Sequence, residues 1–166
     1  MNLIALAIAP IIIILIYVYI RDKYEKEPLG LLLKALLAGA LTTIPIVLVN
    51  SWLEGYKVYF EGLQQVGYIA FAVAGFVEEF FKFAVLFLLI WRHRQFNEKF
   101  DGIVYAVFIS LGFALIENIM YVNNYGETTG YMRAFTAVPA HALFGITMGY
   151  FFSLAKFSEK DQTLNF

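Results

Sequence analysis

Residues 3–17 read LIALAIAPIIIILIY, an apolar run without a charged side chain. An isolated β-strand in lipid would leave its backbone polar groups without hydrogen-bond partners, so the isoleucine-rich composition does not favour a strand here. A signal peptide would need a basic stretch before the run and a small-residue cleavage site after it, and neither is present. We therefore predict a retained transmembrane helix over residues 2–20.

Four further apolar segments follow the first one, at residues 29–49, 66–91, 102–122 and 133–155. Each has about the 20 residues that are needed to cross a bilayer as a helix. The predicted fold is an all-α, polytopic bundle of about five transmembrane helices, in one integral-membrane domain over residues 1–166. We expect Pro45 and Pro139 to kink their helices, because proline cannot donate a backbone hydrogen bond.

Composition restricts the class of protein and its chemistry. Hydrophobic side chains make up 61% of the chain, against about 45–50% in soluble domains, and the mean hydropathy is +0.71. The net charge is -1 and no basic tract is present, so we expect no nucleic-acid partner. The chain has no cysteine, which excludes disulfides, thiol nucleophiles and thiolate metal sites. Any chemistry must use carboxylates, imidazole, amines, hydroxyls or the backbone.

The basic side chains between the apolar segments lie mostly on one side of the membrane. Only Lys57 and Arg133 fall on the other side. Cytoplasmic loops carry an excess of Lys and Arg, so we predict an outside N-terminus and a cytoplasmic C-terminus in the cell membrane. We expect aromatic residues near the segment ends, including Tyr121 and Tyr125, to anchor at the lipid headgroups. The basic side chains assigned to the cytoplasm are Arg21, Lys23, Lys26, Arg92, Arg94, Lys99, Lys156 and Lys160.

Three ionisable residues interrupt the third apolar segment. They are Glu78, Glu79 and Lys82, and each charge costs about 2.5–3.5 kcal/mol to insert at the bilayer centre. Lys82 follows the two glutamates by four and three residues, so all three share a helix face and can form ion pairs. Such a group either locks helices together or marks a functional site.

The next two segments carry Glu117, Asn118 and His141. The rise of 1.5 Å per helical residue allows Glu117 and His141 to meet the carboxyls of the third segment in one pocket in the outer half of the membrane. Three carboxyls facing one ammonium and one imidazole require a bound proton, a bound cation or water. This combination suits general acid–base hydrolysis, and it equally suits a divalent metal such as zinc. The His-Glu-x-x-His signature of many zinc peptidases is absent.

Three ordered motifs on successive segments resemble those of the PrsW family of membrane-embedded proteases. They are Glu78-Glu79-x-x-Lys82, Phe113-x-x-x-Glu117-Asn118, and His141 on the following segment. The resemblance extends along nearly the whole chain. It implies hydrolysis of a peptide bond in a membrane-anchored protein substrate, such as an anti-sigma factor.

The resemblance also implies roles for the residues of the third segment. Glu78 would activate the attacking water, and Glu79 and Lys82 would orient this water or set its charge. The family's further His-x-x-x-Asp motif does not occur in the chain. We therefore expect the chain to lack the family's C-terminal helices.

The residues of the fourth and fifth segments would complete the catalytic pocket. The resemblance assigns Glu117 and His141 to this pocket, and Asn118 or a protonated His141 would stabilise the oxyanion. The residues leave open which glutamate is the base and whether a metal takes part.

Two other functions fit the same buried charges. A proton- or cation-coupled carrier also uses buried carboxyls and histidine, although the sequence shows no inverted repeat of interrupted helices. A non-catalytic membrane scaffold is the third interpretation. The expected partners are membrane lipid, a membrane-anchored protein substrate and a second copy of the chain, through the small-residue pair Gly145 and Gly149.

Overall fold

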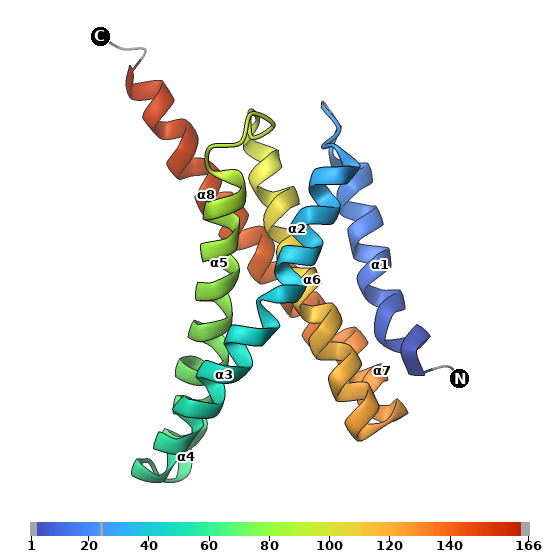
Figure 1. Cartoon of the computed structure of the whole chain (residues 1–166), viewed down its shortest axis with the longest axis vertical. Coiled ribbons are helices and arrows are strands. Elements are labelled where there is room, and N and C mark those ends of the chain that lie inside the picture. The colour runs from blue at the N-terminus through green and yellow to red at the C-terminus, as the bar shows by residue number, and fades with distance from the viewer. Residues whose placement is uncertain (1–2, 24, 164–166) are drawn as a thin grey trace.

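A computed structural model describes residues 3–23 and 25–163, with side chains as far as Ser158, and every regular element in these ranges is helical. The predicted all-α class is therefore confirmed. In chain order the elements are α1 (Leu3–Arg21), α2 (Leu29–Leu41), α3 (Thr43–Glu54), the 3₁₀ helix η1 (Gly55–Tyr59), α4 (Gly62–Gly67), the π-helix η2 (Tyr68–Phe76), α5 (Val77–Ile90), α6 (Lys99–Tyr125), α7 (Glu127–Phe135) and α8 (Ala137–Thr163) (Figure 1).

Four helical stretches of the described chain are long and apolar enough to cross a membrane: Leu3–Arg21, Leu29–Tyr59, Lys99–Tyr125 and Glu127–Ser158. The remaining predicted span, residues 66–91, is helical but consists of α4, η2 and α5 in succession, and α5 has only 14 residues. The start of α1 and the end of α8 lie at opposite ends of the bundle (Figure 1), as an odd number of crossings requires. Which end faces the cytoplasm stays a prediction.

Two proline residues break long helices, as the sequence predicts. Pro45 and Pro139 are each the third residue of their helix, in α3 and α8. A proline has no N–H for the carbonyl four residues earlier, and its ring clashes with that carbonyl. The residues in those earlier positions, Leu41 and Phe135, are the last residues of α2 and α7.

Two predicted connections are largely helical in the structure. The segment 50–65 contains the end of α3, η1 and the start of α4, and the segment 123–132 contains the end of α6 and most of α7. Only Gly126, with φ of +83°, separates α6 from α7. These segments lie between the predicted spans, where we expected connections, but a polar helix is stable at a bundle end when one of its faces packs on neighbouring helices. Gly130 of α7 packs in this way on Leu6 of α1.

Glycines let α2 cross the central helix α6 at very short range. A Cβ atom on Gly39 would lie 2.0 Å from the carbonyl oxygen of Ile109, and one on Gly112 would lie 2.0 Å from that of Leu36. Small residues at a crossing allow two backbones in a membrane to approach and gain van der Waals contact. This crossing fixes α6 against α2, and it thereby places the site residues of α6.

The expected oligomer contact through Gly145 and Gly149 is occupied within the chain. A Cβ on Gly149 would lie 2.3 Å from the carbonyl oxygen of Gly102, and one on Gly145 would lie 3.1 Å from the Cα of Val107. Both neighbours belong to α6, so the two glycines pack α8 on α6 and do not offer a face to a second copy. The sequence could not distinguish the two uses, because small residues serve both kinds of helix contact.

Candidate functional site

The ion pairs predicted within the third segment form at the start of α5. The ammonium Nζ of Lys82 lies 2.7 Å from Oε1 of Glu79 and 3.5 Å from Oε2 of Glu78. Spacings of three and four residues place side chains on one helix face, so α5 builds this group without help from other elements. Lys82 is fully buried, with 0% exposure, and it therefore depends on these carboxylates to offset its charge.

His141 of α8 joins this group from across the bundle. Its Nδ1 lies 3.2 Å from Nζ of Lys82, and its Nε2 lies 3.0 Å from Oε2 of Glu117 on α6. An ammonium can only donate a hydrogen bond, so Nδ1 must be the acceptor and the ring proton must lie on Nε2. His141 thus donates its Nε2–H to Glu117. The structure brings side chains of α5, α6 and α8 into one connected polar cluster.

Arg133 of α7 is a further member of the cluster, which the sequence interpretation missed. Its Nη2 donates to Oε2 of Glu117 over 2.5 Å, and its Nε donates to Oδ1 of Asn118 over 2.7 Å. The guanidinium also lies 4.1 Å from the ring centre of Tyr121. The sequence placed Arg133 at a loop boundary as a mere topology signal. The one available clue was an isolated cation at the first residue of the predicted span that carries His141.

Asn118 lies beside the cluster and not in the cavity described below. Its Nδ2 donates to the carbonyl oxygen of Ala7 in α1 over 2.7 Å, while its Oδ1 accepts from Arg133. The side chain is fully buried. Because both polar atoms already have partners, Asn118 ties α6 to α1 and holds the guanidinium in place. Its predicted oxyanion role stays a prediction.

Arg133 changes the charge balance inferred from the sequence. The carboxylates of Glu78, Glu79 and Glu117 now face two fixed cations, Lys82 and Arg133, within direct ion-pair distance. With a neutral imidazole the cluster therefore carries a net charge of -1, one less negative than the sequence suggested. A site with one excess negative charge still favours a cation or a proton.

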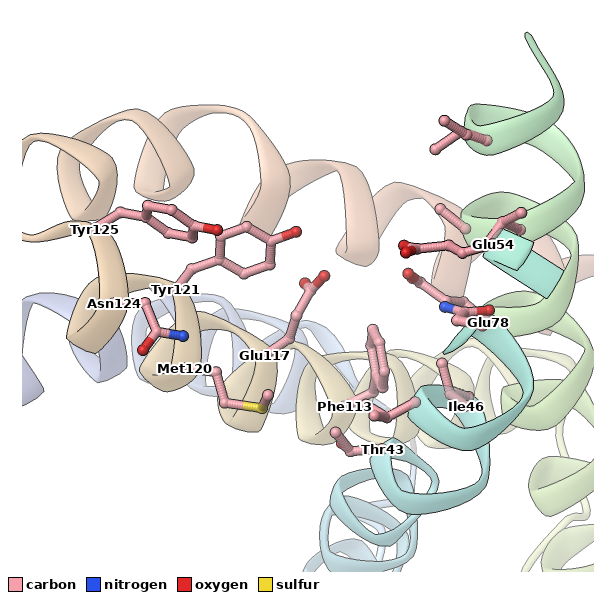
Figure 2. A pocket seen from close by; sticks show the side chains of 15 residues that line it. Thr43, Ile46, Glu54, Glu78, Phe113, Glu117, Met120, Tyr121, Asn124 and Tyr125 are labelled. Atoms are coloured by element: carbon pink, nitrogen blue, oxygen red, sulfur yellow. The ribbon is translucent and has the colours of Figure 1, made fainter. Parts of the chain in front are cut away.

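A cavity of about 370 Å³ opens beside the cluster, between α3, η2, α5 and α6. Figure 2 shows the carboxyl groups of Glu78 and Glu117 pointing into it from two different helices. Tyr121 and Tyr125, which the sequence assigned to the lipid headgroups, also line this cavity. The other lining residues are Thr43, Ile46, Val47, Asn50, Glu54, Ile69, Val73, Ala74, Phe113, Met120 and Asn124.

Three buried oxygen atoms at or beside the cavity have no hydrogen-bond partner among the residues that the structure describes. They are Oγ1 of Thr43, Oδ1 of Asn50 and Oε2 of Glu79. Thr43 and Asn50 line the cavity itself. Buried polar atoms are nearly always paired, so these atoms are available to a bound group.

Glu78, Glu79 and His141 also form a possible metal-binding group. Each offers one ligand atom, and these atoms lie within 4.8 Å of one another. Carboxylate oxygen and imidazole nitrogen are suitable ligands for zinc and for related divalent ions. The unpartnered oxygen of Glu79 adds a free lone pair to the same group. The residues therefore fit a divalent metal.

Curated relatives are similar in sequence to this chain over almost its full length. Protease PrsW of Clostridioides difficile is 42% identical over 161 residues, which cover 95% of this chain and 67% of the relative. Protease PrsW of Bacillus subtilis is 36% identical over 94% of this chain and 70% of the relative. That of Oceanobacillus iheyensis is 37% identical over 100% of this chain and 77% of the relative. No solved structure matches the chain.

The family comparison agrees with these relatives. Residues 27–166 match the family described as PrsW family intramembrane metalloprotease, and this range contains the whole polar cluster. Together with the four membrane-competent helices, the matches show that the chain belongs to the PrsW family and is a multi-pass intramembrane protease.

Proposed function

We propose that this protease cleaves a membrane-anchored protein, such as an anti-sigma factor, inside the cavity beside α5 and α6, with Glu78 as the general base. The observation that carries the proposal is the unequal state of Glu78 and Glu117, two of the three carboxylates that line the cavity. Oε2 of Glu117 already accepts hydrogen bonds from Arg133 and His141. Among the described residues, the carboxylate of Glu78 accepts a single long hydrogen bond, from Lys82 at 3.5 Å. Glu78 is therefore the carboxylate better able to take a proton from a water molecule.

Glu117 has a positioning role in this proposal. Its contact with Nε2 of His141 fixes the imidazole and leaves Nδ1 directed at the ammonium of Lys82. This ammonium also contacts Glu78 and Glu79. Arg133 fixes Glu117, and Asn118 fixes Arg133. The contacts run from α1 to Asn118 of α6, then to Arg133 of α7, and back through Glu117 of α6 to His141 of α8. They hold the catalytic side chains in one geometry before a substrate enters.

The residues that would hold a divalent ion are Glu79, His141 through Nδ1, and Glu78. Such an ion activates water and polarises a carbonyl oxygen when it is bound. The donation of Nε2–H to Glu117 is the contact that a metal-binding histidine ordinarily makes with a neighbouring carboxylate. Nε2 is thus bonded to a carboxylate, and Nδ1 keeps the lone pair that a metal ion needs. This arrangement supports the assignment of His141 as a ligand.

Thr43 and Asn50 are the proposed contacts to the substrate backbone. Each has an unpartnered buried oxygen, and each lines the cavity from α3. A peptide bound beside Glu78 would present backbone N–H and carbonyl groups to these side chains. The Thr43 hydroxyl, which can donate, is the group that we assign to the developing oxyanion.

The test is cleavage of a single-span substrate by protein that has been purified and reconstituted in liposomes. We expect Glu78→Gln to lower the rate by about a hundredfold or more, because general-base catalysis is worth about 10²–10⁴. His141→Ala should abolish cleavage. Glu61→Gln is the matched control, since Glu61 is exposed just before α4 and should leave the rate unchanged.

Elemental analysis, together with the cleavage assay repeated in the presence of a chelator, distinguishes metal-dependent from metal-free hydrolysis. A bound divalent ion together with loss of cleavage in chelator supports the metal arrangement, whereas full activity of metal-free protein removes it. Near wild-type cleavage by both Glu78→Gln and His141→Ala would overturn the catalytic assignment. Ion flux through the liposomes without cleavage would favour a carrier.

A further inference from the structure

The ammonium group of Lys82 lies among the same side chains that make up the possible metal-binding group. Its Nζ is 2.7 Å from Glu79, 3.2 Å from Nδ1 of His141 and 3.5 Å from Glu78. The ligand atoms of those three residues lie within 4.8 Å of one another. The ammonium thus occupies the position of a cation that is coordinated by this group.

We propose that Lys82 is the resident cation of this site, and that its ammonium and a divalent metal ion are alternative occupants. The proposal rests on the proposed function for the identity of the three ligands. It adds that the protein carries a built-in competitor for its own metal. Metal binding then requires the Lys82 side chain to leave the three donor atoms.

Geometry excludes simultaneous occupancy. A zinc ion bonds to nitrogen and oxygen ligands at about 2.0–2.2 Å, so it would lie among the three donors at the place that Nζ now approaches. The lone pair of His141 Nδ1 can serve either the ammonium hydrogen or a metal, but not both. Two cations at this separation would also repel each other strongly in a buried site.

Phe113 provides a second position for the displaced ammonium. Nζ of Lys82 already lies 4.3 Å from the centre of the Phe113 ring, within the range of a cation–π contact. Phe113 lines the cavity, so a small rotation of the lysine side chain towards this ring keeps the ammonium near polar groups. Lys82 therefore does not need to enter lipid when it leaves the donors.

The arrangement has two consequences for the site. Without metal, Lys82 offsets the charge of two partly buried carboxylates that would otherwise repel each other. A divalent ion that replaced it would offset the same charge, with Glu78, Glu79 and His141 as its ligands. The lysine thus lowers metal affinity and preserves the shape of the unloaded site.

The experiment is calorimetric titration of metal-free protein with Zn²⁺ in detergent, without any peptide substrate. Lys82→Met removes the ammonium and keeps a side chain of similar length, and Lys82→Arg keeps the charge. Lys34→Met is the matched control, because Lys34 is exposed on α2. We expect Lys82→Met to bind Zn²⁺ on the order of tenfold more tightly than wild type, a usual size for coupling between two binding events. Lys82→Arg and Lys34→Met should show no gain.

Thermal unfolding gives a second readout. Zn²⁺ should raise the midpoint of Lys82→Met by more than that of wild type, because the ion replaces a missing cation. If Lys82→Met folds only with Zn²⁺ present, the result supports the proposal as well. Equal or weaker zinc binding by Lys82→Met, or a variant that Zn²⁺ does not restore, overturns it. The cleavage assay is separate, so this failure is distinguishable from failure of the peptidase mechanism.

Discussion

His141 donates its Nε2–H to Oε2 of Glu117 over 3.0 Å, on the side of the ring that faces away from Lys82. The two ring nitrogens therefore make different kinds of contact. Nε2 fixes the orientation of the imidazole, and Nδ1 presents its lone pair to the ammonium of Lys82 on α5. This asymmetry distinguishes Glu117, which His141 and Arg133 both contact, from the glutamates of α5.

Glu117→Gln should reduce cleavage less than Glu78→Gln does. A glutamine oxygen can still accept from His141, so we expect a loss of about 10–100-fold, as is usual when a carboxylate that orients a ligand is replaced. The measurement is the cleavage rate of both variants at saturating substrate. If Glu78→Gln were active and Glu117→Gln inactive, Glu117 would be the general base and Glu78 the positioning residue.

Arg133→Met should impair cleavage although Arg133 does not line the cavity. The loss removes one of the two donors that hold Oε2 of Glu117 and leaves Oδ1 of Asn118 without its donor. We expect a decrease of about 10–100-fold in kcat, with KM changed little because no substrate contact is lost.

Arg133→Lys provides the matched comparison. A lysine keeps the charge but cannot bond to Glu117 and Asn118 with two fixed N–H groups. We therefore expect partial rescue of kcat. Equal rates for wild type and Arg133→Met would show that α7 contributes only to packing.

Gly39→Ala should destabilise the α2–α6 crossing. The added Cβ would lie 2.0 Å from the carbonyl oxygen of Ile109, and this backbone atom can move only together with its helix. We expect a cost of about 1–3 kcal/mol, as for other overpacked cores, which thermal unfolding in detergent would detect. Gly30→Ala is the control, because nothing lies within 4 Å of the position of its Cβ. Equal midpoints for the two variants would contradict the close crossing.

Glu27 should make stability depend on pH. This residue lies in the connection between α1 and α2, where its carboxylate accepts a hydrogen bond from the Tyr105 hydroxyl. Burial, together with the nearby carboxyls of Asp101 and Asp22, raises the pKa of Glu27 from 4.5 to about 8. The folded protein therefore holds this proton more tightly than the unfolded chain does. Its stabilising contribution is complete below pH 4.5 and is lost as the pH rises through 8.

Glu27→Gln should remove this dependence, because the amide cannot lose a proton. We expect the unfolding midpoint of wild type to fall from pH 5 to pH 8 relative to that of the variant. The measurement is thermal unfolding at both pH values. Parallel midpoints over this range would show that Glu27 does not hold its proton in the folded state.

Local contacts were predictable from the sequence. The ion pairs of Lys82 with Glu78 and Glu79 follow from spacings of three and four residues on one helix. The breaks at Pro45 and Pro139 follow from a missing N–H, and the helical class follows from the backbone's need for internal hydrogen bonds in lipid. None of these conclusions requires knowledge of which helices are neighbours.

The contacts between helices were not predictable in the same way. Nothing in the sequence indicated that Asn118 faces α1 while its neighbour Glu117 faces α8. Nor did it indicate that Arg133 of α7 contacts both residues. Tyr121 and Tyr125 illustrate the same limit, since an aromatic ring near a span end suits a headgroup as well as a cavity wall.

Hydrophobic periodicity identifies the buried face of a helix in water, but a helix in lipid is apolar all round. The residues of this chain therefore determined its helices, their breaks and the charged group on α5. Its tertiary structure decided which helix faces meet, because this depends on the rotation and crossing of whole helices. Close approach at Gly39 and Gly112 sets the crossing of α2 and α6, and the packing around α6 directs Glu117 to His141 and leaves the cavity open beside Glu78.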